Sequence, residues 1–332
     1  MNTVLLICGL PASGKSSAVE LTKKLNYVRL NRDELGGTVA GLLPKLDQLL
    51  QDGKNVVLDN LFTAAEDRKP FIELALKRGA DPQALHINTS PEDCQLNACL
   101  RMAKKYGHVL TPDEIKAAKD PNSFPPAVFF KAKKAFKVPT TGEGFSKVLK
   151  KNFTRDWPAE YCNKAIILDY DGTLRETIGG NGKFPTKVSE VKVYKERGDV
   201  LRYYQNQGYL LLGASNQSGI AKGDLSHDDA KACFDYTNEQ LDIKIEYLYD
   251  ASRVPPITSW NRKPMPGMGA TFIEKYKLLP RECIMVGDMT SDKTFANRCG
   301  FQYEDQSSFF QEHHSDEMRY DADNFGSNPK PR

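Results

Sequence analysis

Two short motifs in the sequence combine residue types that handle phosphate. Residues Gly9–Ser16 read GLPASGKS and match the pattern GxxxxGK[ST]. Residues Asp169–Thr173 read DYDGT and match DxDGT. Average residue usage makes both patterns rare by chance in a chain of 332 residues. Each half of the chain therefore carries a candidate site for phosphoryl chemistry.

The glycine-rich run predicts a loop that binds the phosphates of ATP. Glycines let backbone N–H groups converge on phosphate oxygens, and the following helix adds its positive end. An apolar strand at Val4–Cys8 precedes the run and a helix follows it, as the motif requires. We expect Lys15 to contact the β- and γ-phosphates and Ser16 to bind Mg²⁺. The predicted ATP-binding residues are Gly9, Pro11, Ala12, Ser13, Gly14, Lys15, Ser16 and Ser17.

Polar residues follow two further predicted strands in the first half. Asn31-Arg32-Asp33 comes after the strand Tyr27–Leu30, and Asp59-Asn60 ends the strand Val56–Leu58. In parallel sheets these positions lie at the carboxyl edge, where ligands bind. Asp33 is therefore a candidate general base on an acceptor hydroxyl, with a helix cap as the alternative. Asp59 is a candidate acid near Mg²⁺, with a strand-end turn as the alternative.

Two basic features of the first half are open to two interpretations each. Arg101 lies late in a helix predicted at Pro91–Tyr106. A lid helix could carry it onto the transferred phosphate, as an arginine finger does, or it could belong to a solvated face. The segment Lys131–Lys151 holds seven lysines and one acid, with phenylalanines interspersed. It is either a nucleic-acid-binding surface or an amphipathic helix with a charged face.

The DxDGT motif predicts a phosphatase that uses a carboxylate nucleophile. It follows the strand Lys164–Leu168 and resembles the first motif of the haloacid dehalogenase-like superfamily. Asp169 would attack phosphorus and form an aspartyl-phosphate. Asp171, two residues on in an extended segment, projects on the same side. It would protonate the leaving alkoxide and then deprotonate the hydrolytic water.

Later segments follow in the order of that superfamily, each at the end of a predicted strand. Ser215 would hold a phosphoryl oxygen, and Lys263 would balance the charge of the phosphoryl group. Supporting roles in the two sites are predicted for Arg32, Asn60, Thr173, Asn216, Arg262 and Asp292.

Acidic residues of the second half form a predicted magnesium site. Asp288, after the strand Cys283–Val286, would bind Mg²⁺ together with Asp169 and the backbone carbonyl of Asp171. Oxygen ligands of this kind suit Mg²⁺.

Longer segments of the first half resemble the kinase domain of the polynucleotide kinase/3′-phosphatase family. They are CGLPASGKSS, YVRLNRDELG, VVLDN, NTSPEDCQLNACLRM and PTTGEGFSKV, and the resemblance covers most of residues 3–150. It implies that Asp33 activates the 5′-hydroxyl of a nucleic-acid end. Gly36 stands where some phage-type members carry arginine, and Leu61 replaces the third residue of the family's DNT motif.

The second half resembles two groups of phosphatases. SNQSGIAKG and NRKPMPGM are similar to 3′-phosphatase domains and to small sugar- and histidinol-phosphate phosphatases. The latter often carry a Cys- and His-rich zinc loop before the RKP motif. Asp250–Asn261 contains neither residue type, which favours the polynucleotide branch. Gly179–Pro185 predicts a loop in place of a large cap domain, and hence an open site that admits a chain end.

The order of the elements predicts an α/β protein with two doubly wound parallel-sheet domains. We place a P-loop kinase domain at residues 1–152, a haloacid dehalogenase-like phosphatase domain with a minimal cap at 160–312, and a mobile tail at 313–332. Phe153–Asn163 is the predicted linker. Further strands are expected at Ala84–Ile87, Leu210–Gly213 and Ile245–Tyr249, and helices at Leu46–Gln51 and Glu66–Lys77.

Composition narrows the class of protein. Residues 1–155 hold 24 Lys and Arg against 16 Asp and Glu, whereas residues 156–332 hold 22 against 27. A basic first half suits a polyanionic partner. Seven cysteines without a CxxC pair fit reduced thiols in an intracellular compartment. No apolar run approaches the ~18 residues of a membrane span, and no signal peptide is expected.

Together these features predict nucleic-acid end healing with ATP and Mg²⁺ as cofactors. A 5′-hydroxyl would be phosphorylated and a 3′-phosphate removed, which are the ends that a ligase joins downstream. The sequence does not distinguish DNA from RNA. The alternatives are a nucleoside or sugar kinase fused to a sugar-phosphate phosphatase, and a module that binds nucleic-acid ends without catalysis.

Overall fold

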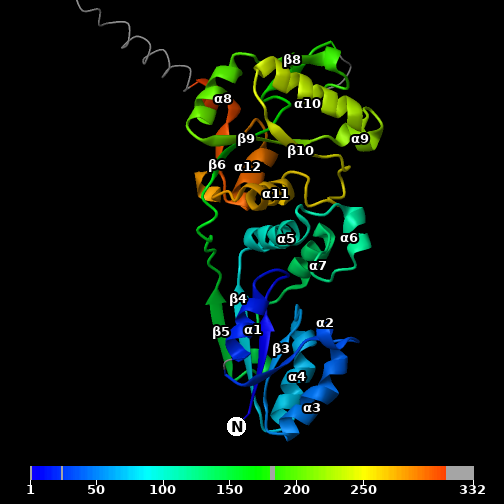
Figure 1. Ribbon diagram of the computed structural model, residues 1–332. Coiled ribbons are helices and arrows are strands. Elements are labelled where there is room, and N and C mark those ends of the chain that lie inside the picture. The colour runs from blue at the N-terminus through cyan, green and yellow to red at the C-terminus, as the bar shows by residue number, and fades with distance from the viewer. Residues whose placement is uncertain (1, 24, 180–183, 312–332) are drawn as a thin grey trace, which may run out of the picture. The chain divides into compact units, whose positions relative to one another are not determined.

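A computed structural model describes residues 2–23, 25–179 and 184–311 (Figure 1). The chain divides into two compact units, which are described separately. Unit 1 combines Met1–Ala98 with Glu114–Asp156, and unit 2 combines Cys99–Asp113 with the chain from Trp157 onward. Within the described residues, no helix is long and apolar enough to cross a membrane.

Unit 1 is built on a parallel five-stranded sheet in the order β2-β3-β1-β4-β5. Alternate residues of the central strand face opposite layers of helices. Val4, Leu6 and Cys8 pack in the same cluster as α3 and α4, whereas Leu5 and Ile7 pack with α1. The strands are β1 (Thr3–Cys8), β2 (Tyr27–Leu30), β3 (Asn55–Asp59), β4 (Asp81–Asn88) and β5 (Lys147–Asn152).

The helices of unit 1 connect successive strands of this sheet. Between β1 and β4 they are α1 (Lys15–Lys23), α2 (Arg32–Leu35), α3 (Leu43–Gln51) and α4 (Ala65–Lys77), with a 3-10 turn at Ala40–Leu42. Beyond β4 they are α5 (Pro91–Tyr106), α6 (Pro112–Ala118) and α7 (Pro126–Ala135), with a 3-10 turn at Thr141–Glu143. The end of α5 falls within the segment that is grouped with unit 2, where the Val109 backbone bonds the side chains of Thr271 and Asn261.

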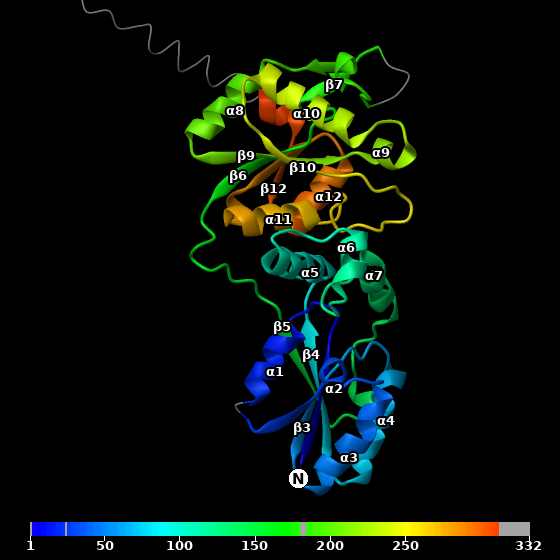
Figure 2. The same cartoon turned by 45° about the vertical axis from the view of Figure 1, so that its right-hand side comes forward.

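Unit 2 contains a second parallel sheet in the order β10-β9-β6-β11-β12 and a small antiparallel pair, β7-β8 (Figure 2). The strands are β6 (Lys164–Leu168), β7 (Arg175–Thr177), β8 (Val191–Val193), β9 (Tyr209–Asn216), β10 (Glu246–Asp250), β11 (Ile284–Gly287) and β12 (Gln302–Asp305). The helices are α8 (Arg197–Asn206), α9 (Ser218–Lys222), α10 (His227–Leu241), α11 (Gly267–Tyr276) and α12 (Thr290–Cys299), with 3-10 turns at Val188–Glu190 and Pro280–Glu282.

The predicted fold class is confirmed, because both sheets are parallel and carry connecting helices. The interpretation of Lys131–Lys151 as one amphipathic helix is wrong, and its interpretation as a nucleic-acid-binding surface stays a prediction. Helix α7 ends at Ala135, and the last residues form the edge strand β5. Of the nearby aromatic rings, Phe129 and Phe145 are buried in the protein interior and thus do not form an exposed stacking surface.

Two predictions lie wholly or partly outside the described residues. Residues 180–183 of the expected loop after the DxDGT motif and the expected tail at 313–332 belong to this set. The predicted domain bounds, 1–152 and 160–312, stay a prediction. The two compact units are divided differently, because residues 99–113 group with unit 2 and the later boundary between the units falls between Asp156 and Trp157.

Candidate active sites

The glycine-rich loop joins β1 to α1 at the carboxyl edge of the first sheet. A Cβ atom on Gly9 would lie 2.6 Å from the Ser13 hydroxyl oxygen and 3.1 Å from the Ile87 carbonyl oxygen, so only glycine fits there. Gly14 has a φ of 92°, which disfavours other residues. Ala12 also has a positive φ, of 59°. The loop is therefore tightly wound, as phosphate binding requires.

Hydrogen bonds from α5 and the segment before it orient this loop. The Thr89 hydroxyl donates to the Ser13 carbonyl at 2.7 Å, and the Asn97 amide donates to the Ala12 carbonyl at 3.0 Å. Arg155 in turn donates to the Asn97 side-chain oxygen at 2.7 Å. A carbonyl and the next N–H point in opposite directions across a trans peptide. Because Thr89 and Asn97 bond the loop carbonyls, the backbone N–H groups that follow these carbonyls point away from Thr89 and Asn97. The geometry fits the binding of phosphate oxygens.

Lys15 is half-buried at the first position of α1, and its ammonium group lies over the loop. Nζ donates to the carbonyls of Gly9 at 3.1 Å and Leu10 at 2.8 Å. Ser16 and Ser17 follow it and are exposed. The positions predicted to contact ATP and Mg²⁺ are thus gathered at one end of α1.

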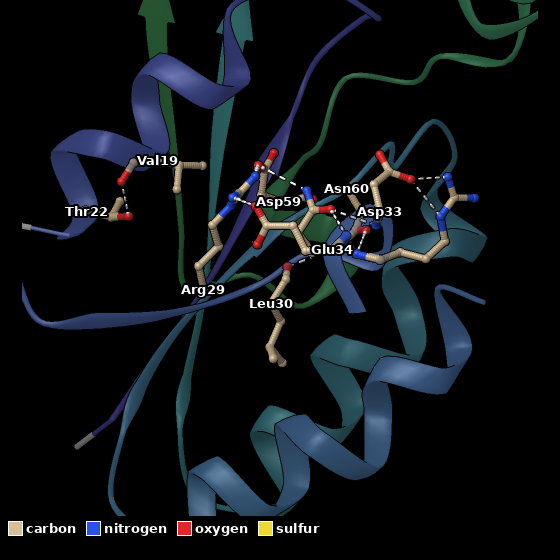
Figure 3. A network of polar contacts seen from close by, with 10 residues as sticks. Val19, Thr22, Arg29, Leu30, Asp33, Glu34, Asp59 and Asn60 are labelled. Atoms are coloured by element: carbon tan, nitrogen blue, oxygen red, sulfur yellow. Dashed lines mark hydrogen bonds and ion pairs between the residues drawn. The ribbon is translucent and has the colours of Figure 1, made fainter. Parts of the chain in front are cut away.

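A polar network joins the ends of β2 and β3 beside this loop (Figure 3). The Asn31 amide donates to the Asp59 carbonyl at 2.7 Å, and the Asn60 side-chain oxygen accepts from the Arg32 backbone N–H at 2.9 Å. Arg29 donates through Nε to the Asp59 carboxylate at 3.1 Å. Since Asp59 pairs with Ile7 in the register of β1 and β3, the network lies next to the strand that leads into the loop.

Asp33 stands in the first turn of α2, with 49% of its side chain exposed. Asn31 is the residue that caps this helix, and its side-chain oxygen accepts from the Asp33 backbone N–H at 2.7 Å. The Asp33 carboxylate is paired with Arg32. Its position leaves it accessible to an acceptor hydroxyl, and its role as a base stays a prediction.

Arg101 is half-buried in α5, in the part of the helix that groups with unit 2. The glycine-rich loop belongs to unit 1. The structure therefore does not assign Arg101 to the same unit as the loop, and its role as a lid arginine stays a prediction.

In unit 2, Asp169 ends β6 and lies against Lys263. The Lys263 ammonium is 2.9 Å from Asp169 Oδ1 and 2.7 Å from Asp292 Oδ1, and all three side chains are at least nine-tenths buried. Burial raises the pKa of the Asp169 carboxyl to about 7, although Lys263 acts in the opposite direction. Burial by itself lowers the pKa of Lys263, but the two carboxylates raise it above its ordinary value. The nucleophile predicted from the motif thus has a buried cation beside it.

Both oxygens of the Asp171 carboxylate are held by side chains from other elements. Arg175 donates from Nε to Oδ1 at 2.8 Å, and Gln217 donates from Nε2 to Oδ2 at 2.9 Å. Gln217 also donates to the Ser215 hydroxyl at 2.9 Å. Arg175 is 1% exposed, and its guanidinium carbon lies 4.8 Å from the centre of the Phe234 ring. We call Arg175 and Gln217 the Asp171 clasp.

Asn216 and Lys263 tie two of the predicted segments together. The Asn216 amide donates to the Lys263 carbonyl and its side-chain oxygen accepts from the Lys263 N–H, both at 2.9 Å. Arg262 donates to the Ser252 carbonyl at 2.9 Å. Thr173 is fully buried, and Arg197 donates to its carbonyl oxygen. The Asn216 bonds hold the end of β9 against the segment that carries Lys263.

The acidic cluster at this edge suits a divalent cation. Carboxylate oxygens of Asp169, Asp288 and Asp292 lie within 4.8 Å of one another. A Cβ on Gly172 would lie 2.3 Å from Asp288 Oδ2, so this glycine lets Asp288 approach the loop that carries Asp171. An oxygen-only donor set of this kind fits Mg²⁺. Asp292 was predicted only to support this site, but its carboxylate is also close enough to the other two to be a candidate ligand.

Comparison with protein families assigns both units. Residues 164–324 match the family described as Polynucleotide kinase 3 phosphatase, and residues 4–119 match an AAA domain family. The chain belongs to the polynucleotide kinase 3 phosphatase family. Unit 1 is accordingly a P-loop kinase domain and unit 2 a haloacid dehalogenase-like phosphatase domain, so the protein is an enzyme with two kinds of phosphoryl chemistry.

Curated relatives match the phosphatase domain. A "Probable D-glycero-D-manno-heptose-1,7-bisphosphate 7-phosphatase" of Thermoplasma volcanium is 30% identical over 139 residues, which are 41% of this chain and 92% of the relative. The D-glycero-beta-D-manno-heptose-1,7-bisphosphate 7-phosphatase of Haemophilus influenzae is 32% identical over 139 residues, which are 39% of this chain and 73% of the relative. These relatives act on sugar phosphates by name, and the family model is named for polynucleotides.

A solved structure named as the Pnkp1/Rnl/Hen1 complex aligns with both domains. It covers 92% of this chain and 96% of its own chain, with 16% identity and a TM-score of 0.33. A likeness of this size carries no argument about substrate.

Three residues whose side chains bond the predicted carboxylates Asp59 and Asp171 were missed from the sequence. They are Arg29, Arg175 and Gln217. Arg29 interrupts the apolar strand Tyr27–Leu30, and an arginine inside such a strand indicates a nearby acid. Arg175 lies two residues after the DxDGT motif and Gln217 directly follows Asn216, but the sequence does not show that both reach the same carboxylate.

The Asp171 clasp predicts a specific kinetic defect. Replacing Arg175 with Met is expected to lower kcat/KM for an alkyl phosphate about tenfold to hundredfold, because general acid catalysis contributes roughly 10²–10⁴ and needs a positioned carboxyl. Hydrolysis of p-nitrophenyl phosphate should fall far less, since its leaving group needs no proton. The measurement is the ratio of the two kcat/KM values, which report the steps up to transfer of phosphate to Asp169.

A matched control removes another contact of the same arginine. Arg175 donates to the Thr237 hydroxyl at 3.2 Å, and Thr237→Val deletes that bond but keeps the contact with Asp171. This variant should keep the wild-type ratio, whereas Gln217→Met should shift it as Arg175→Met does. Equal losses on both substrates in the Arg175 variant would assign the arginine to packing alone.

Gly172 provides a test of the metal site. Gly172→Ala should raise the Mg²⁺ concentration that gives half-maximal phosphatase activity at least about tenfold, because the new Cβ displaces Asp288. Gly208→Ala is the control, since Gly208 has a φ of 83° close to the 87° of Gly172 but has no atom within 4 Å of the added Cβ. An unchanged Mg²⁺ requirement in Gly172→Ala would exclude Asp288 as a ligand.

Proposed function

We propose that this protein heals broken nucleic-acid ends, by phosphorylating a 5′-hydroxyl with ATP and by hydrolysing a 3′-phosphate. The observation that carries the proposal is the joining of a P-loop kinase domain to a phosphatase domain of the Polynucleotide kinase 3 phosphatase family in one chain. The two products, a 5′-phosphate and a 3′-hydroxyl, are the ends that a ligase requires. A ligase is therefore the partner that we propose downstream.

In the kinase reaction, the acceptor is placed at the carboxyl edge of the first sheet. The glycine-rich loop would hold the phosphates of ATP, with Lys15 on the β- and γ-phosphates. Asp33 takes the proton of the 5′-hydroxyl as its oxygen bonds to the γ-phosphorus and the bond to ADP breaks. Arg29 and Asn31 keep Asp59 in place beside the loop, where Ser16 and Asp59 would hold Mg²⁺.

In the phosphatase reaction, Asp169 attacks the phosphorus of the 3′-phosphate. The bond to the 3′-oxygen breaks, and Asp171 gives that oxygen a proton. Water then attacks the aspartyl-phosphate, Asp171 takes its proton, and inorganic phosphate leaves. Ser215 and Lys263 hold the phosphoryl oxygens, and the carboxylates of Asp169 and Asp288 would hold Mg²⁺, which supplies positive charge to the phosphoryl group.

The test uses the purified wild-type chain on defined ends. A 5′-hydroxyl oligonucleotide with ATP and Mg²⁺ should gain one phosphate, and a 3′-phosphorylated oligonucleotide should lose one. DNA and RNA versions are assayed side by side, with D,D-heptose 1,7-bisphosphate and mononucleotides as competitors. Lack of turnover on every oligonucleotide, or preference for the sugar phosphate, would overturn the proposal in favour of small-molecule metabolism.

A further inference from the structure

The phosphatase pocket has two chemically different regions. It is a cavity of ≈ 320 Å³ with Asp169, Asp171, Ser215 and Lys263 among its lining residues. Its remaining wall includes the apolar side chains of Phe184, Val254, Ile257 and Met289. We call these four residues the apolar rim. The polar region is the phosphate site described above, so the rim is left for another part of the substrate.

The rim residues come from three separate connections of unit 2. Phe184 precedes the 3-10 turn at Val188–Glu190, Val254 and Ile257 lie in the loop between β10 and α11, and Met289 caps α12. Figures 1 and 2 both show the β10–α11 loop on the same side of the unit as α9. Phe184 is 46% exposed, and Val254 and Met289 are each 42% exposed. Large apolar side chains with this exposure beside a pocket are typical of a binding surface.

Several polar groups of the pocket already bond other protein groups. The Asn216 side chain donates to the Lys263 carbonyl and accepts from the Lys263 backbone N–H. The Lys263 ammonium forms ion pairs with the carboxylates of Asp169 and Asp292. Arg262 donates to the Ser252 carbonyl. Discrimination among polyols requires hydrogen-bonding groups placed for each hydroxyl. An apolar wall instead favours a flat, weakly hydrated group such as a nucleobase, which gains from contact with aromatic and aliphatic side chains.

We propose that the apolar rim binds the terminal nucleobase of a 3′-phosphorylated chain end. This inference rests on the proposed function and specifies which part of the end the phosphatase recognises. With the 3′-phosphate against Asp169, the base is the first apolar group beyond the sugar. The cavity volume lies at the low end of the roughly 300–1,000 Å³ of small-molecule sites, which suits one terminal nucleotide.

The rim should act on affinity more than on chemistry. Its side chains are apolar and carry no group that takes part in the reaction, so we expect their contact with the base to be the same in the ground state and in the transition state. Loss of such uniform binding raises KM and leaves kcat unchanged. A base stacked on an aromatic side chain gives an effect of about tenfold when that side chain is truncated to alanine.

The experiment compares two oligonucleotides that differ only in the last base. Both end in a 3′-phosphate, and one carries a natural nucleotide while the other carries an abasic residue at that position. Wild-type protein should show about tenfold higher kcat/KM on the base-bearing end. Phe184→Ala should erase this preference by raising KM for the base-bearing end alone. Tyr203→Ala is the matched control, because Tyr203 is 45% exposed in the same unit and lies outside the pocket lining.

The outcomes separate this inference from the proposed function. Equal rates of wild-type protein on the two ends, or an equal loss on both ends in Phe184→Ala, would overturn the role of the rim and leave 3′-phosphatase activity standing. Failure of wild-type protein to hydrolyse either end would overturn the proposed function and the inference together. Should Phe184→Ala fold poorly, Met289→Ala serves with the same substrates and the same expected change in preference.

Discussion

Replacement of Asp169 by Asn is expected to abolish phosphatase activity and leave kinase activity unchanged. Asn has nearly the same size, but its amide is too weak a nucleophile to attack phosphorus. Loss of a covalent nucleophile should lower kcat on a 3′-phosphorylated oligonucleotide by about 10³-fold or more. The measurement is release of inorganic phosphate, with phosphorylation of a 5′-hydroxyl end assayed on the same preparation.

The surroundings of Asp169 make this variant interpretable. Its neighbour Lys263 keeps a second carboxylate, that of Asp292 at 2.7 Å, so the buried cation is not left alone. Burial disfavours the charged form of Asp169, and a neutral amide removes that cost. We therefore expect a folded protein, checked by thermal unfolding. Residual phosphatase activity near the wild-type level would assign the nucleophile elsewhere, and parallel loss of kinase activity would indicate that the variant is misfolded.

The buried parts of the fold were predictable from the sequence. Strands with both faces covered read as continuous apolar runs, and β6, with four fully buried residues, occurs with the expected bounds. Helix α5 also begins and ends as predicted. Its start is encoded locally, because Ser90 caps the Asp93 backbone N–H at 3.0 Å and Pro91 occupies the first turn.

Exposed strands were not predictable in the same way. Strand β5 reads KVLKKN and is largely exposed, with lysines in place of an apolar run. Lysines on an edge strand discourage pairing with other chains. Because they replace the apolar residues that indicate a buried strand, the sequence pattern does not predict β5. Strand β12 reads QYED and has no buried residue. Both strands owe their conformation to the neighbour with which they pair.

In the two sites, residues that belong to local motifs were predictable, and contacts between distant segments were not. Sequence motifs located Lys15, Asp169 and Asp171 because each belongs to a fixed pattern next to a strand. The partners of these residues depend on which strands are neighbours. The ion pair of Arg29 with Asp59 joins β2 to β3, and Gln217 reaches Asp171 from the end of β9. Such contacts follow from the sheet order, which the motifs do not contain.

Replacement of Lys15 by Met is the reciprocal experiment in the kinase domain. Met keeps an unbranched side chain but removes the ammonium, which lies over the loop and contacts the carbonyls of Gly9 and Leu10. A cation on the β- and γ-phosphates stabilises the charge that moves during transfer. Phosphorylation of a 5′-hydroxyl oligonucleotide should fall about 10²–10³-fold or more, the size of effect seen when one such electrostatic group is removed. Release of phosphate from a 3′-phosphorylated end should be unchanged.

Lys54 supplies the matched control for this variant. It is exposed, and it precedes β3, so it lies at the amino end of the strand, whereas the glycine-rich loop follows the carboxyl end of β1. Lys54→Met should keep both activities. If Lys15→Met and Lys54→Met lose kinase activity to the same extent, the effect arises from the general charge of the basic unit. If only Lys15→Met loses it, and Asp169→Asn loses only the phosphatase, each reaction belongs to its own domain, because no single shared site could respond in this reciprocal way.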